Sequence, residues 1–417
     1  MTNSKLRLLD TQKLILISII LACFTPRFIR FMKLNVGFFN MSFYSIAVLL
    51  SFFISQSFKK IRIKATINTL FLPLLLLVII IDVARTDDLA GWTQYFFYAL
   101  ICNLLLILLN RFSDKNLYLQ IVKILSLAVF IHIMIGFFEI TTHRYIFGVG
   151  HFSQRLWGNV AVSIFYNPND YSMFISTMCP FVFYMCIKSK GLIKKLFYGF
   201  TIAGSFILMI LTSSRAAIIS IFMCGFLLGL ILFKNNKYKI FMVLLVFAGV
   251  FIYLTNPSVQ ASVNLLFSEI SIDTSSQSDS QRINLIRNGF YFLNKTHWLG
   301  VGAGNLKEWL QNRSIYYIGR LLYIHNWYME VLVTFGVIIF LLYAWFHINI
   351  FRWLYKGIKT RDNDFGLTLS FFMSFVVFSI TSISSSSNIY SEWFWMYIAI
   401  VSSYITYLQV HKKMSEV

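Results

Sequence analysis

The sequence predicts an all-α polytopic membrane protein with about twelve transmembrane helices. Of its 417 residues, 58% are hydrophobic and only 12% are charged, whereas a soluble domain carries about 25% charged residues. Apolar runs recur along the chain, near the roughly 20 residues that a spanning helix needs. This composition excludes a soluble globular enzyme, and 44 Phe with 22 Tyr exclude a disordered chain.

The apolar runs place the spanning helices in twelve segments. These are 12–26, 36–56, 66–84, 90–109, 118–139, 169–187, 196–212, 215–233, 238–255, 327–351, 366–385 and 393–410. If the N-terminus is inside, the inside segments carry most of the 36 lysines and arginines. Cytoplasmic connections collect such residues, so we expect a multi-pass protein with both termini in the cytoplasm.

We expect one integral-membrane domain over residues 1–417, with two long outer connections at 140–168 and 256–326. Outer connections are normally poor in cations, yet these two carry several arginines, among them Arg144, Arg155 and Arg313. An outer cavity that binds an anion would explain them; the alternative is a solvated loop with scattered charges. The net charge of +20 otherwise reflects cytoplasmic loops and predicts no nucleic-acid partner.

The first group that can carry chemistry is the short outer turn Leu211-Thr-Ser-Ser-Arg215, which begins a helix. Backbone N–H groups at a helix start attract anions, and the planar fork of an arginine matches a phosphate. The alternative is an interfacial arginine whose charged head reaches the membrane surface.

The second group is a helix that starts near Ser278 in the long outer connection. Its apolar residues recur at helical spacing and predict an amphipathic helix on the outer surface of the bundle: Ile283, Ile286, Phe290 and Leu293. Arg282 falls in the first turn, where the helix dipole disfavours a cation. A local rule broken in this way indicates a functional residue, and the alternative is an exposed surface arginine.

The third group is the glycine-rich stretch Gly300-Val-Gly302-Ala-Gly304-Asn305. It resembles a nucleotide-binding turn, but no βαβ unit surrounds it. We therefore expect a tight backbone turn that lies close to the membrane or to a ligand.

The fourth group is His325-Asn326-Trp-Tyr-Met-Glu330, which opens the tenth segment. Histidine is the usual general base near neutral pH. Glu330 lies one turn deeper on the face of Asn326, and ionisable groups within a membrane are candidates for function. The alternative is an interfacial histidine in an aromatic belt. Cysteine spacing offers no zinc site, and we expect no metal or cofactor.

These four groups occur in an order that resembles the O-antigen ligase and O-antigen polymerase (Wzy-type) superfamily, as does the stretch Asn167-Pro-Asn169-Asp170. The similarity covers roughly 160–340 by motif and the whole chain by topology. It implies a C-type glycosyltransferase bundle with a large outer loop that contains short helices, in the bacterial inner (plasma) membrane. It also implies a glycan donor on undecaprenyl diphosphate and transfer to an acceptor sugar hydroxyl at the outer face, apparently without metal.

The resemblance also assigns roles to residues of this chain. His325 would be the general base on the acceptor hydroxyl, and Arg215 and Arg282 would bind the leaving diphosphate, since fixed cations stabilise developing negative charge. Direct attack would invert the anomeric centre. Five further residues are expected to bind substrate: Arg155, Asn169, Arg287, Asn326 and Glu330.

Three functions are compatible with this sequence. The preferred one is a polymerase that joins repeat units of a capsule, O-antigen or exopolysaccharide, in company with a chain-length regulator protein. The second is a ligase that moves the finished glycan to lipid A core or another acceptor. The third is a flippase or transporter of lipid-linked oligosaccharide. Paired halves and discontinuous helices are frequent in transporters, and the sequence shows no internal repeat.

Overall fold

A computed structural model describes most of the chain. It covers residues 2–25, 33–36, 39–55, 67–146, 160–165, 167–212, 214–232, 236–237, 240, 275–319, 321–360, 364–385 and 388–415. A helix lies in eleven of the twelve segments that hydropathy predicts. The remaining segment, 238–255, lies outside the described residues except for residue 240.

The described elements follow the expected order along the chain. The helices are α1 (Thr2–Phe24), α2 (Phe43–Ser55), α3 (Ile67–Ile81), η2 (Asp82–Arg85), α4 (Leu89–Arg111), α5 (Lys115–Thr142), α7 (Pro168–Lys188), α8 (Leu192–Leu211), α9 (Arg215–Leu232), α12 (Ser275–Lys295), α13 (Leu306–Asn312), α14 (Trp327–Thr360), α15 (Phe365–Thr381), η3 (Asn388–Tyr390) and α16 (Glu392–Ser415). One short antiparallel hairpin pairs β1 (Lys33–Val36) with β2 (Phe39–Ser42).

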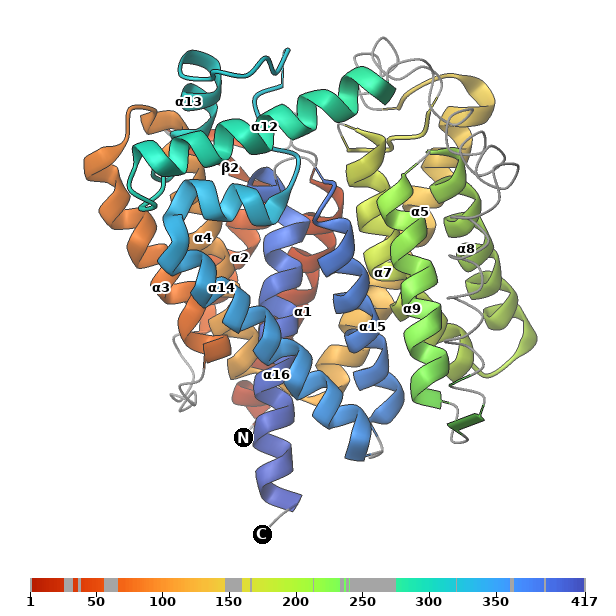
Figure 1. The fold of residues 1–417 in the computed structure, drawn as a ribbon. Helices are drawn as coiled ribbons and strands as arrows, with labels where there is room; N and C mark the ends of the chain where they lie inside the picture. The colour runs from red at the N-terminus through yellow and green to blue at the C-terminus, as the bar shows by residue number, and fades with distance from the viewer. Residues whose placement is uncertain are drawn as a thin grey trace, which may run out of the picture.

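The long helices form a bundle, and α12 lies across one end of it (Figure 1). We call this end the α12 end. Both chain termini lie at the opposite end of the bundle (Figure 1). The all-helical membrane fold is confirmed. Among the described residues, six helices are long and apolar enough to span a membrane: α4, α5, α7, α8, α9 and α14. The count of twelve is not confirmed.

Two of the predicted spans differ from the structure. Residues 33–36 and 39–42, partly within the segment 36–56, form the hairpin strands, and α2 begins only at Phe43. The helix α14 is broken at Gly336, whose φ of 80° is not helical. Its first segment, Trp327–Phe335, lies beneath α12, and the remainder runs down the bundle (Figure 1). Hydropathy gives no sign of the break at Gly336, because the apolar run continues through it. It also cannot separate the strand 39–42 from the helix that follows within the segment 36–56.

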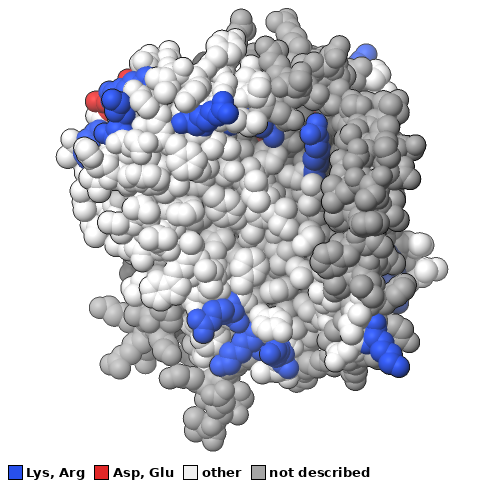
Figure 2. Space-filling model, viewed as in Figure 1, with Lys and Arg blue, Asp and Glu red and all other residues white. Residues whose placement is uncertain are grey.

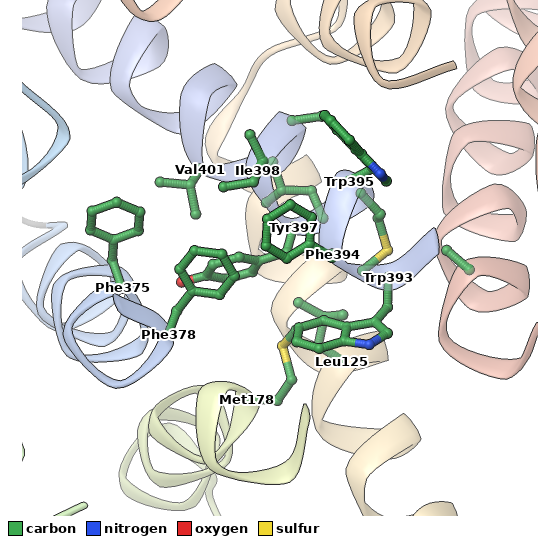
Figure 3. Close-up of a cluster of buried hydrophobic side chains, with 14 of the residues drawn as sticks. Leu125, Met178, Phe375, Phe378, Trp393, Phe394, Trp395, Tyr397, Ile398 and Val401 are labelled. Carbon is green, nitrogen blue, oxygen red and sulfur yellow. The ribbon is translucent and has the colours of Figure 1, made fainter. Parts of the chain in front are cut away.

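Aromatic side chains fill the centre of the bundle. Figure 3 shows this cluster, to which α5, α7, α15 and α16 contribute. Phe371 and Tyr404 stack with ring centroids 4.0 Å apart, and Phe394 packs edge-on against Trp327. Hydroxyls in this core pair across helices, as Ser374 does with the Tyr397 hydroxyl at 2.8 Å. The bundle is therefore held mainly by close packing, with small polar pairs between helices.

Lysines and arginines gather at the two ends of the visible face, and an uncharged band lies between them (Figure 2). This is the distribution expected when the band faces lipid and the two ends face water. It supports a protein that spans the membrane, with α12 on one surface.

A second, smaller core lies under α12. It is formed by side chains of α12, of residues 301–324 and of the first segment of α14; we call these elements the outer layer. The expected apolar face of α12 is wrong in part. Ile283 and Phe290 are exposed, whereas Leu285 and Phe292 are buried, because the buried side of this helix also carries Asn288, which binds the neighbouring loop.

Candidate functional site

The glycine-rich turn fixes the outer layer to the break in α14. The Val301 amide donates to the Val333 carbonyl, and the Gly302 amide donates to the Thr334 carbonyl, both at 2.9 Å. A side-chain carbon at Gly300 would lie 2.5 Å from the Gly336 nitrogen. The glycines therefore permit close backbone approach, and the turn satisfies carbonyls that the helix break leaves open. The expectation of a tight turn close to the membrane fits this arrangement.

A second set of bonds joins this turn to the N-terminal third of the chain. Asn305 is 1% exposed; its Oδ1 accepts from the Asp87 amide at 2.8 Å, and its Nδ2 donates to the Arg85 carbonyl at 2.9 Å. The Ala303 amide donates to Asp82 Oδ2 at 3.0 Å. Asp82 is itself held by Arg85. Asp82 and Asn305 thus position the outer layer over the bundle.

His325 lies at the entrance to the first segment of α14. Its φ of 54° is in the left-handed region, and Asn326 next to it caps the helix, since its Oδ1 accepts from the Met329 amide at 3.1 Å. The Trp327 amide donates to the Ser382 carbonyl at 3.0 Å. The segment that begins at His325 is thereby attached, at Ser382, to the connection between α15 and α16.

Arg282 reaches the same connection from α12. Its Nη1 lies 3.5 Å from Ser384 Oγ. Arg282 contacts Ser384, and Trp327, two residues after His325, is bonded to Ser382. The structure therefore brings Arg282 and the chain segment that contains His325 to the same connection at the α12 end. Sequence reasoning missed the serine connection, because a run of serines is typical of an ordinary loop.

Arg215 is the first residue of α9, as expected, and it is exposed. The helix α9 begins at the α12 end (Figure 1). The turn before it contacts the start of α7, because the Ser172 and Thr212 hydroxyls lie 2.5 Å apart. Arg215 therefore shares the α12 end with Arg282 and His325.

The start of α7 agrees with the predicted Asn-Pro-Asn stretch leading into a span. Asn167 caps the helix by accepting from the Asp170 amide at 2.8 Å, and Asn169 lies partly buried in the first turn. Asp170 and Glu392, both buried, line a small cavity with Tyr390. The cap explains Asn167 but gives Asn169 no separate role.

The remaining predicted substrate-binding residues lie in different environments. Glu330 is 1% exposed, one turn beyond Asn326. Arg287 is exposed, and its guanidinium lies 5.7 Å from the centre of the Tyr316 ring. Arg155 lies outside the described residues. Arg287 thus lies beside Tyr316, on a different face of α12 from Arg282, which contacts Ser384.

Two buried polar residues near the end of α5 were not foreseen. Glu139 Oε2 accepts from the Val162 and Ser163 amides at 2.9 and 2.8 Å. His132 bonds Ser163 Oγ at 2.9 Å and the Cys23 carbonyl at 3.0 Å. They fix the described part of the connection 140–168 to α1 and α5. Within the described ranges, no group of three His, Cys, Asp or Glu side chains could hold a metal ion.

The fold and this cluster define an integral-membrane helical protein with its candidate polar groups gathered at one end. A family described as O-antigen ligase matches residues 200–344, which include Arg215, Arg282 and His325. The chain is 26% identical over 322 residues to the teichuronic acid biosynthesis protein TuaE of Bacillus subtilis (strain 168); the match covers 74% of this chain and 65% of that relative. The resemblance to the O-antigen ligase and polymerase superfamily is confirmed.

Proposed function

We propose that this protein is a glycosyltransferase of polysaccharide biosynthesis that polymerises lipid-linked repeat units. Its donor is an oligosaccharide on undecaprenyl diphosphate, and its acceptor is a sugar hydroxyl at the outer face of the bacterial plasma membrane, with both termini cytoplasmic. The observation that carries the proposal is the attachment of Arg282 and of the His325 segment to one serine connection, within a region that matches the O-antigen ligase family.

The chemistry follows from the residue types. His325 removes the proton from the acceptor hydroxyl as its oxygen attacks the anomeric carbon. The bond between that carbon and the diphosphate oxygen breaks, and the configuration inverts. Arg215 and Arg282 stabilise the charge that develops on the diphosphate. The contact with Ser384 fixes Arg282 in place before the reaction.

The experiment uses the purified full chain in nanodiscs with the host's undecaprenyl-diphosphate repeat unit. Lipid-linked products are separated on a gel, and a ladder with one-repeat spacing is expected. His325→Ala should reduce the rate about a hundredfold or more without changing the amount of folded protein. His143→Ala is the matched control, because His143 also has a left-handed backbone, with a φ of 55°, and is exposed. Retained transfer in His325→Ala would rule out the general-base role.

A ligase is the second candidate, because the matching family is described as O-antigen ligase. In that case no ladder forms, and glycan moves only when lipid A core or another finished acceptor is added. Glycolipid that crosses the bilayer of vesicles without any transfer would instead indicate a transporter. If the polymerase assignment is right, addition of a chain-length regulator should narrow the range of product lengths in the ladder.

A further inference from the structure

A hollow of about 400 Å³ lies in the outer layer, between the end of α13 and the chain that returns to α14. Its lining includes Gln311, Ser314, Tyr316, Tyr317 and Leu322. Tyr317 is 73% exposed and Tyr316 is 41% exposed. Two adjacent tyrosines are thus presented to the surroundings beside polar side chains.

The backbone that carries these tyrosines is firmly held. Asn288, which is fully buried, accepts from the Ile315 and Tyr316 amides at 2.9 and 3.0 Å and donates to the Tyr316 carbonyl at 2.9 Å. Asn284 Nδ2 donates to the Tyr317 carbonyl at 2.9 Å. These asparagines lie one turn apart on α12. The loop is therefore fixed through its main chain, and the tyrosine side chains stay directed outward.

The chemistry of the hollow suits a saccharide. A pyranose ring has an apolar C–H face and polar edges, and a tyrosine ring offers an apolar face with a hydroxyl at its tip. Gln311 and Ser314 add groups that can bond sugar hydroxyls. Arg287 beside Tyr316 adds one positive charge. Because the backbone is already ordered, binding requires little further loss of conformational entropy.

The hollow adjoins the candidate centre on both sides. Leu322 lines it and precedes His325 by one short stretch of chain. Gly319, also in its lining, packs against the Gln281 amide next to Arg282. A glycan whose end lies at His325 and Arg282 can therefore continue along the chain segment that lines the hollow.

We propose that this hollow binds the saccharide chain of the acceptor, at sugars beyond the one that reacts. The inference rests on the proposed function, because it assigns the bound chain to the same transfer reaction. It makes Tyr316 and Tyr317 binding residues for the acceptor that take no part in bond formation.

The test measures direct binding and transfer separately. The probes are oligosaccharides of one, two and four repeat units released from the host's own surface polysaccharide. Tyr316→Ala/Tyr317→Ala should weaken binding of the four-repeat probe to the full chain in nanodiscs about tenfold. The same variant should raise KM for long acceptors and leave kcat unchanged. The one-repeat acceptor should react as with the unmodified protein, and the Phe/Phe variant should retain most of the binding.

Tyr355→Ala is the matched control. Tyr355 is 45% exposed, and a lysine lies 5.0 Å from its ring, but it is near the other end of α14. It should change neither binding nor KM. Unchanged binding of the four-repeat probe in the double alanine variant would overturn the proposal, even if product length changed, since that pattern indicates a protein partner. If the four-repeat probe binds in a way that depends on the two tyrosines but the protein transfers no glycan, the saccharide-binding role of the hollow is supported and the proposed transferase activity is disproved.

Discussion

The helical core and the outer layer are held together by different means. In the core, aromatic rings stack and the polar contacts are scattered within an extensive apolar surface, as for Tyr118 and Ser403 at 2.8 Å. In the outer layer, a few side chains and glycines bind backbone directly, as Asn305 and Asp82 do. Loss of one polar contact should therefore matter little in the core and much in the outer layer.

The largest effect is expected at Gly300. Gly300→Val places a branched side chain against the Gly336 backbone at a φ of 81°, which should destabilise the outer layer by about 3 kcal/mol. Transfer should be lost while the bundle still inserts. Limited proteolysis of residues 275–319 would detect the released layer. Gly199→Ala is the control, because a Cβ there meets nothing within 4 Å. Equal protease resistance in both variants would show that Gly300 does not hold the outer layer in place.

Asn305→Ala should have the next largest effect. It removes the partner of the Asp87 amide and of the Arg85 carbonyl, at a cost of about 2 kcal/mol. Thermal unfolding in nanodiscs should show an early transition confined to the outer layer. Asn312 is exposed and bonds only Glu308 among the described contacts, so Asn312→Ala should leave the transition where it was. A single cooperative shift of the whole protein would argue against a separate layer.

A smaller effect is expected at the helix cap beside the histidine. Asn326→Ala removes the acceptor for the Met329 amide, at a cost of about 1 kcal/mol. Transfer should fall because His325 loses its fixed position. Asn326→Ser should restore both stability and rate, since serine also caps helices. If Asn326→Ser restores stability but not the rate of transfer, the asparagine side chain contacts substrate.

The smallest effect is expected in the core. Tyr397→Phe removes one hydroxyl that bonds Ser374, while Ser374 keeps its bond to the Thr177 carbonyl at 2.6 Å. Bonds of this kind between membrane helices contribute about 0.6 kcal/mol. The unfolding temperature should hardly change, and transfer should be unaffected. A loss as large as that of Asn305→Ala would remove the distinction between the two regions.

The helices of the fold were largely predictable, since apolar runs report on burial and on lipid. The break at Gly336 was not, because it lies in sequence that stays apolar. The strands 33–36 and 39–42 were not, because hydropathy merges the second strand with the helix that follows it. Ile283 and Phe290 were expected on the bundle side of α12 and are exposed. Periodicity alone cannot tell which side of a helix receives a buried asparagine such as Asn288.

The candidate site was predictable only through motif order. Spacing in sequence gives no reason for Arg282 and His325 to share a connection near Ser384, which lies 102 residues from Arg282. The same holds for Asp82 and Ala303, which are 221 residues apart. Local patterns identified the candidate residues, whereas the contacts that hold their chain segments in place are long-range and leave no local pattern in the sequence.

The bond between Asp82 and Ala303 has a consequence for synthesis of the protein. The ribosome completes residues 82–88 long before it reaches residue 300. In the newly inserted N-terminal helices the Asp82 carboxylate therefore has Arg85 beside it but lacks the Ala303 amide, and the Asp87 amide lacks Asn305. Only when the glycine turn and α14 have been translated and inserted can the last bonds form. A truncated or stalled chain therefore cannot fix the glycine turn to the N-terminal helices, and the α12 end is completed only near the end of translation.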